Sequence, residues 1–254
     1  SLSTSKDFQV NGVEDEVIQE AHKMVGRAEQ VEEILTMIRE RKNGVLWIEG
    51  LPGMGKSALM AKLYTELIEN LPVPNQTVLP YRFRTNDQDR CNRNSFAQFV
   101  IERLIASDVL QESFEDQPKE KTEKRLENAL GQLGEDRSLV LLLDGLDEIH
   151  LSDSSFVEKI PLSLRFSKVL WICSSRPEPG IKEPMHRLAA ERVFPEGLPP
   201  MNEHDVRAMF MEKLGPLQRK KLIANEQDEA GNLQSPFIYQ VTERAGGLPL
   251  YVVY

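Results

Sequence analysis

The segment Gly50-x-x-x-x-Gly55-Lys56-Ser57 constrains the fold of this chain more than any other feature of the sequence. A short apolar run, residues 45–49, precedes it, and a helical pattern, residues 57–69, follows it. In such a strand–loop–helix unit the glycines let backbone N–H groups turn inward around a phosphate, and the helix adds the positive end of its dipole. The pattern therefore predicts a phosphate-binding loop in an α/β fold.

Backbone and side chains of this segment have separate expected roles. The ammonium of Lys56 would reach the β- and γ-phosphates of a nucleotide, and the hydroxyl of Ser57 would bind Mg²⁺. The backbone expected to surround the phosphates belongs to Gly50, Pro52, Gly53, Met54, Gly55, Lys56, Ser57 and Ala58. The alternative interpretation is a glycine-rich turn that only joins a strand to a helix.

A second carboxylate for the metal follows the apolar run of residues 139–143. A strand buried on both faces that ends in Asp144 would bring this carboxylate to the edge of the sheet where the phosphate loop lies. We expect Asp144 to act on Mg²⁺ largely through a bound water. Asp147 and Glu148 come next, and one of them could polarise the attacking water as general base. The alternative is that both cap the following segment and face solvent.

Apolar runs and helical patterns alternate along the chain, which predicts right-handed crossovers and a parallel sheet with helices on both faces. Residues 1–20 are polar and acidic and are interpreted as a linker or a loosely packed arm. After Pro200 the pattern is wholly helical, with a predicted N-cap at Asn202. Further strands are predicted at residues 78–84, 169–173 and 192–194, and further helices at residues 30–43, from Ser95, 121–133 and 235–245.

These patterns predict an arm at residues 1–24, a phosphate-loop nucleotide-binding domain at 25–200 and a helical lid at 201–254. The sequence begins at Ser1 and stops within an apolar run at Tyr254, which we interpret as a fragment of a longer protein. The net charge of −9 argues against a nucleic-acid backbone as the main partner. The apolar runs are too short to cross a bilayer. Cys91 and Cys173 lack metal spacing and are predicted as free thiols in a reducing compartment.

The pattern D-G-h-D-E at residues 144–148 resembles the Walker B variant of NACHT NTPases, which belong to the STAND class of signalling ATPases. Residues 169–177 resemble the sensor strand of that family, which usually ends in Thr-Ser-Arg-Pro, and Ser174 stands here where threonine is usual. The resemblance implies that Arg176 touches the γ-phosphate of ATP, which has no counterpart in ADP. The alternative is a surface arginine that caps the end of a strand.

Two further matches lie at the ends of the same region. Val25, Gly26 and Arg27 resemble the V-G-R-E signature, whose backbone approaches the adenine, although the glutamate stands one position later. Residues 247–250 resemble the G-L-P-L motif, in which Pro249 would pack near the adenine and ribose. For Pro249 the alternative is an ordinary helix stop. The resemblance covers residues 25–250 and implies an AAA+-like core with a small helical lobe.

The resemblance implies a regulatory ATP/ADP switch that hydrolyses ATP slowly. Such a switch would control the oligomerisation of a larger cytoplasmic signalling protein of the defence or cell-death type, as in innate immunity. The implied partners are other copies of the chain and, in the parent protein, effector, sensor and winged-helix domains. One alternative is an AAA+-type motor or loader that acts on protein or nucleic acid. Another is a kinase, which would need an acceptor site and a mobile lid.

Overall fold

The computed structural model describes residues 7–111, 122–159 and 167–215, together with residues 244 and 246. Its centre is a sheet with the strand order β2-β3-β4-β1-β5, in which every pair is parallel. The strands are β1 (Gly44–Glu49), β2 (Gln76–Arg82), β3 (Ser138–Asp144), β4 (Val169–Ser175) and β5 (Glu191–Arg192). The predicted parallel α/β fold is confirmed.

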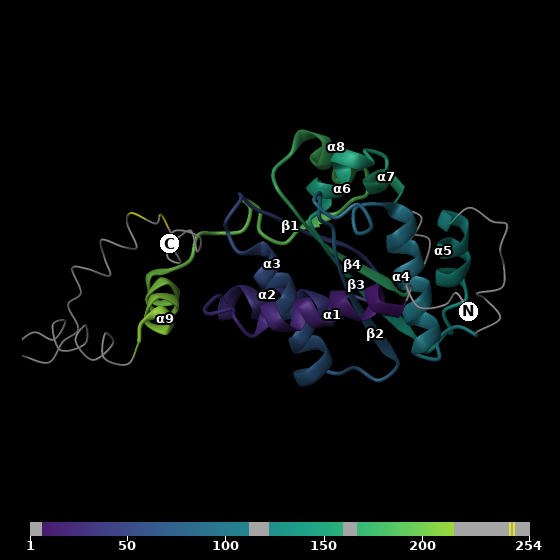
Figure 1. Ribbon diagram of the computed structural model, residues 1–254, viewed down its shortest axis with the longest axis horizontal. Helices are drawn as coiled ribbons and strands as arrows, with labels where there is room; N and C mark the ends of the chain where they lie inside the picture. Colours follow the sequence, from purple (N-terminus) through teal and green to yellow (C-terminus); the bar gives the residue numbers. More distant parts are fainter. Residues whose placement is uncertain (1–6, 112–121, 160–166, 216–243, 245, 247–254) are drawn as a thin grey trace, which may run out of the picture.

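Helices cover both faces of this sheet (Figure 1). One face packs against α1 (Asp7–Ala21), α2 (Ala28–Arg39) and α3 (Lys56–Thr65), which continues into a π-helical turn, Glu66–Asn70. The other face packs against α4 (Arg93–Ala106), α5 (Thr122–Gly131), α6 (Leu146–Ser152), α7 (Phe156–Lys159) and α8 (Pro179–Arg187). A last helix, α9 (Glu203–Lys213), lies outside these layers.

Strand β3 shows how the sequence builds the two layers. Leu139, Leu141 and Leu143 point into one apolar core, and Val140 and Leu142 point into the other. Successive side chains of a strand alternate between faces, so a strand covered on both faces needs a continuous apolar run. The prediction of a strand buried on both faces is confirmed.

The register of the strands brings the site together. Arg82 at the end of β2 is opposite Asp144 at the end of β3, and Glu49 at the end of β1 is opposite Ser175 at the end of β4. Beyond the strand ends, the N–H of Gly50 donates to the carbonyl of Ser175 at 3.1 Å. The phosphate loop, the acidic segment and the predicted sensor arginine therefore start from one edge of the sheet.

The structure corrects the interpretation of residues 7–20 as a linker or a loosely packed arm. Residues 7–21 form α1, and Val13, Val17 and Ala21 are buried. These apolar residues recur every four positions and so share one face of the helix. The face is narrow and lies among many acidic residues, which is why its periodicity was too weak to predict a helix.

Smaller differences concern the ends of elements. Helix α4 is capped by Asn92, whose side-chain oxygen accepts from the N–H of Ser95 at 2.8 Å, so the predicted cap at Ser95 is wrong. β2 ends at Arg82, two residues before the prediction, and β5 ends at Arg192. The N-cap of α9 at Asn202 is confirmed, since its side chain accepts from the N–H of Asp205 at 2.7 Å.

Further predictions concern the C-terminal residues and the two cysteines. Apart from residue 244, which is helical, the predicted helix at residues 235–245 lies outside the described residues, and so does the motif at residues 247–250. Cys91 and Cys173 are both free, as predicted, and both are buried. Among the helices that the structure describes, none has the length and apolar character that a membrane span requires.

Candidate functional site

The loop between β1 and α3 has the backbone that its glycines predict. Gly53 and Gly55 have φ values of 78° and 82°, a region that strains any other residue. A Cβ on Gly50 would lie 3.1 Å from the Cβ of Leu198 and 3.3 Å from the Cδ of Lys56. The glycines of this segment are therefore required by its backbone conformation.

Lys56 is the first residue of α3, and its side chain folds back over the loop. Its Nζ donates to the carbonyl oxygens of Gly50 at 2.7 Å and Leu51 at 3.0 Å. Burial lowers the pKa of Lys56, and the charges of Asp147 and Asp144 act in the opposite direction. The ammonium is thus partly desolvated beside two carboxylates, where an anionic phosphate would be a strong additional partner.

A cavity of about 810 Å³ opens beside this loop, a volume in the range of small-molecule sites. Its lining includes ten of the predicted site residues: Pro52, Gly53, Gly55, Lys56, Ser57, Ala58, Asp144, Asp147, Glu148 and Arg176. Gly50 and Met54 belong to the loop but do not line the cavity. Val25, Gly26 and Arg27 do not line the cavity either, and Pro249 lies outside the described residues.

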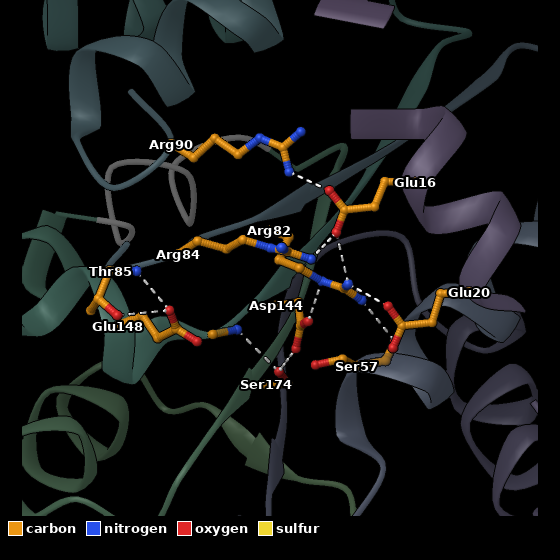
Figure 2. A network of polar contacts seen from close by, with 11 residues as sticks. Glu16, Glu20, Ser57, Arg82, Arg84, Thr85, Arg90, Asp144, Glu148 and Ser174 are labelled. Carbon is orange, nitrogen blue, oxygen red and sulfur yellow. Dashed lines mark hydrogen bonds and ion pairs between the residues drawn. The ribbon is translucent and has the colours of Figure 1, made fainter. Parts of the chain in front are cut away.

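Asp144 is a buried carboxylate of the cavity, and each of its oxygens has a donor (Figure 2). Oδ2 accepts from the Nε of Arg82 at 2.8 Å, and Oδ1 accepts from the hydroxyl of Ser174 at 2.5 Å. Ser174 is the residue that replaces the usual threonine of the sensor strand. Its hydroxyl retains the donor that the buried carboxylate needs.

The donor set of the cavity fits a magnesium ion carried by a nucleotide. Within the described ranges no group of three or more His, Cys, Asp or Glu residues is arranged to hold a metal. Mg²⁺ bound to nucleotide phosphates needs only one or two oxygen ligands from the protein and keeps several waters. The Ser57 hydroxyl and the Asp144 carboxylate both line the cavity and are ligands of that kind.

The two further acids lie in the first turn of α6, which follows Gly145 at a φ of 83°. Asp147 accepts the backbone N–H of Arg176 on Oδ1 at 3.0 Å and pairs with its Nε through Oδ2 at 3.2 Å. Glu148 accepts from the backbone N–H of Thr85 at 2.7 Å. Both carboxylates face the cavity, and they hold different segments of its wall.

Arg176 follows the end of β4, and its side chain is 49% exposed. The partner predicted for it from the sequence is the γ-phosphate of ATP. In the structure it already has a partner within the protein, the carboxylate of Asp147. Arg176 is therefore held at the cavity by a pair that a phosphate would have to compete with.

Arg27 joins the phosphate loop to α9. Its guanidinium donates to the carbonyls of Met54 at 2.8 Å and Pro199 at 3.0 Å, and its backbone N–H donates to Asp205 at 2.8 Å. Burial lowers the pKa of Arg27 to about 10, against the effect of the Asp205 charge, so it stays charged at neutral pH. The V-G-R segment thus contacts the phosphate loop through the side chain of Arg27.

Seven residues of the cavity wall were not predicted as site residues from the sequence: Glu20, Arg82, Arg84, Thr85, Asn86, Gly145 and Ser174. One signal was available, because β2 is parallel to β3 and its last residues must lie at the same edge as Asp144. Glu20 could not be placed without α1.

Solved structures of low sequence identity are similar to this chain. The Orc1 protein of Aeropyrum pernix, solved in complex with DNA, is 15% identical, with 86% of this chain and 57% of that chain covered and a TM-score of 0.50. A STAND protein of Pyrococcus horikoshii with a tetratricopeptide repeat sensor is 16% identical, with coverages of 90% and 29% and a TM-score of 0.49. Drosophila ORC bound to DNA is 14% identical, with coverages of 100% and 68% and a TM-score of 0.48. This chain spans less than two thirds of the first two.

No curated protein matches the chain significantly in sequence. Residues 27–176, more than half of the chain, match the sequence model of the family described as Nephrocystin 3, N-terminal. This range runs from Arg27 to Arg176 and contains the phosphate loop and the acidic segment. Together with the fold, the match confirms the recognition of a STAND-type P-loop NTPase. The chain belongs to the Nephrocystin 3, N-terminal family.

Proposed function

We propose that this chain is a regulatory ATP/ADP switch that hydrolyses ATP slowly. The observation that carries the proposal is the Arg176–Asp147 pair at the wall of the phosphate cavity. Arg176 is half-exposed, so its side chain can exchange one partner for another. A γ-phosphate offers it such a partner, and ADP does not.

The charged and hydroxyl side chains predicted for the site have separate roles in this proposal. Lys56 binds the β- and γ-phosphates, and Ser57 and Asp144 hold Mg²⁺, which supplies charge neutralisation at the phosphates. Arg176 exchanges Asp147 for the γ-phosphate. Glu148 orients the attacking water as general base, because it lines the cavity and its two contacts with Thr85 use the same carboxylate oxygen, Oε2.

The same contacts favour slow hydrolysis. Asp147 is engaged by Arg176 through both oxygens, and Glu148 is held by the backbone of Thr85. A carboxylate that already accepts hydrogen bonds from a neighbouring segment is less free to activate water. A switch requires a long-lived ATP state, whereas a motor requires rapid turnover. We therefore expect a turnover well below about one per second, the lower end of ordinary enzymes.

The nucleoside end of the ligand is assigned to residues around the loop. Val25, Gly26 and Arg27 approach the adenine from one side, and Pro249 of the helical lid closes over it from the other. The contact of Arg27 with both Met54 and Pro199 supports this placement, since it fixes the V-G-R segment beside the loop. Deleting residues 246–254 should weaken binding of ADP more than binding of inorganic triphosphate. Equal losses for the two ligands would contradict the assignment.

At the level of the parent protein, the nucleotide state would control association with other copies of the chain. In a larger cytoplasmic signalling protein, an effector domain would produce the signal and a sensor domain would receive the trigger. The acidic net charge of −9 supports protein partners over nucleic acid. The principal rival remains an AAA+-type motor or loader.

Calorimetric titrations with Mg-ATP and Mg-ADP test the switch. Lys56→Ala should abolish or strongly weaken binding of both nucleotides. Arg176→Ala should keep the affinity for ADP and lose about tenfold of the affinity for ATP, the value of one charge-assisted contact. Arg187→Ala is the matched control, because Arg187 pairs with Glu158 and Glu183 away from the cavity.

Turnover measured with and without DNA separates the switch from the motor. Fast hydrolysis, or strong stimulation by DNA, would favour the motor. Unchanged nucleotide affinity in Lys56→Ala would contradict the nucleotide site itself, and an unchanged preference in Arg176→Ala would contradict only the sensor role.

A further inference from the structure

Arg82 ends β2 beside the metal-side carboxylate, and only 8% of its side chain is exposed. Its Nε donates to Asp144 at 2.8 Å, and its Nη2 donates to the backbone carbonyl of Ser57 at 3.3 Å. The guanidinium therefore lies directly against both residues that are assigned to Mg²⁺. A buried cation in this place must compete with a metal ion for the same carboxylate, since like charges repel more strongly as they approach.

The other side of the same guanidinium faces α1 (Figure 2). Its Nη1 pairs with Glu16 at 3.1 Å and with Glu20 at a shorter distance. Glu16 and Glu20 are one turn apart and lie on the same face of the helix. Arg82 thus stands between one carboxylate on β3 and two on α1.

Glu16 also takes part in further ion pairs of this network. It also pairs with Arg84 and, at 2.5 Å, with Arg90. Glu20 is different, because Arg82 is its ion-pair partner in the described part of the chain and Glu20 lines the cavity. A substitution of Glu20 therefore weakens the attraction between α1 and Arg82 and breaks fewer other ion pairs than a substitution of Glu16.

We propose that Arg82 is a positioning residue that orients Asp144 and competes with Mg²⁺ for it, and that Glu16 and Glu20 of α1 set the strength of this competition. When Mg²⁺ binds, Arg82 gives up part of its contact with Asp144 and its guanidinium is held by the two glutamates. Helix α1 thereby determines how much Mg²⁺ the site requires. The proposal rests on the proposed function, in which Asp144 and Ser57 serve a magnesium nucleotide.

The test is a magnesium titration of the full chain at a saturating concentration of a fluorescent ADP analogue carrying a methylanthraniloyl group. The measured quantity is the Mg²⁺ concentration at half-maximal binding. Arg82→Gln removes the competing cation and keeps an amide donor, so the half-maximal concentration should fall about tenfold, the value of one charge-assisted hydrogen bond. Glu20→Gln leaves Arg82 more firmly on Asp144, so the concentration should rise about twofold to fivefold, as for a partly exposed ion pair.

Glu14→Gln is the matched control. Glu14 is on α1, pairs with Arg103 at 2.8 Å and does not line the phosphate cavity. This variant should keep the wild-type magnesium requirement. A loss of folded protein would lower the amplitude of binding but would leave the midpoint unchanged, so structural damage is distinguishable from the proposed effect.

The opposite signs of the two variants make the outcome decisive. Shifts of Arg82→Gln and Glu20→Gln in the same direction, or midpoints equal to that of the wild type, would overturn the role of Arg82 and leave the proposed function intact. Binding that is independent of Mg²⁺ in the wild type and in Glu14→Gln would overturn both.

Discussion

Replacing Asp205 with alanine should loosen α9 from the phosphate loop. The Asp205 carboxylate is buried and accepts the backbone N–H of Arg27 at 2.8 Å. Its removal leaves that N–H without its acceptor and deprives the buried Arg27 guanidinium of a neighbouring negative charge. A buried hydrogen bond to a charged group contributes about 1.5–3 kcal/mol to the free energy of unfolding. For a chain of this length such a loss lowers the melting temperature by about 3–12 °C.

Thermal unfolding of four proteins at pH 8 would measure this effect: the wild type, Asp205→Ala, Asp205→Asn and His204→Ala. Asp205→Asn keeps an acceptor and should lose less, because a neutral hydrogen bond contributes about 0.5–1.5 kcal/mol. The His204 side chain is 88% exposed on the same helix and lies 3.7 Å from the Asp205 carboxylate, so His204→Ala should change the melting temperature far less than Asp205→Ala. If Asp205→Ala melted within about 2 °C of the wild type, the carboxylate would not connect the two segments.

The remaining predictions concern the acids of the cavity and its surroundings. Asp147→Asn should release Arg176 and reduce the preference for ATP, whereas Glu148→Gln should slow hydrolysis and keep the preference; calorimetry and phosphate release distinguish them. Burial alone would raise the pKa of Glu16, but the hydrogen bond from Arg90 and three arginine charges hold it below its usual 4.5. Glu16 should therefore stabilise the fold above about pH 4.5 and lose this contribution as the pH falls further. The stability of Glu16→Gln should depend less on pH below 4.5, and an acid titration of the unfolding free energy measures this.

Local spacing explains why much of the site could be predicted. The loop at residues 50–57 needs glycines at fixed positions, because its backbone takes φ values near 80° at Gly53 and Gly55. Asp144 follows a continuous apolar run, which is typical of a parallel strand covered on both faces. Since parallel strands all end at one edge, the loop and the carboxylate could be placed together from the sequence.

Long-range pairing explains why the rest was missed. Glu16 and Glu20 reach Arg82 across more than 60 positions of the chain, and no local pattern marks that pairing. Helix α1 itself shows only a narrow apolar face, so its acids were interpreted as a solvated arm. The cap of α4 depends on a choice between Asn92 and Ser95, which only the path of the preceding loop decides.

The cavity contains two internal ion pairs of the same kind, Arg176–Asp147 and Arg82–Asp144. In the proposed function a γ-phosphate competes for the arginine of the first pair, and Mg²⁺ competes for the aspartate of the second. An isolated buried charge costs several kcal/mol, so a site that left the buried Arg82, Asp144 and Asp147 unpaired until a ligand arrived would be destabilised. Exchange between partners avoids that cost for Arg82, because Glu16 and Glu20 already pair with it and can hold it when Mg²⁺ takes Asp144. The energy difference between the two arrangements can then be small, which is the condition for a nucleotide to shift the balance between them.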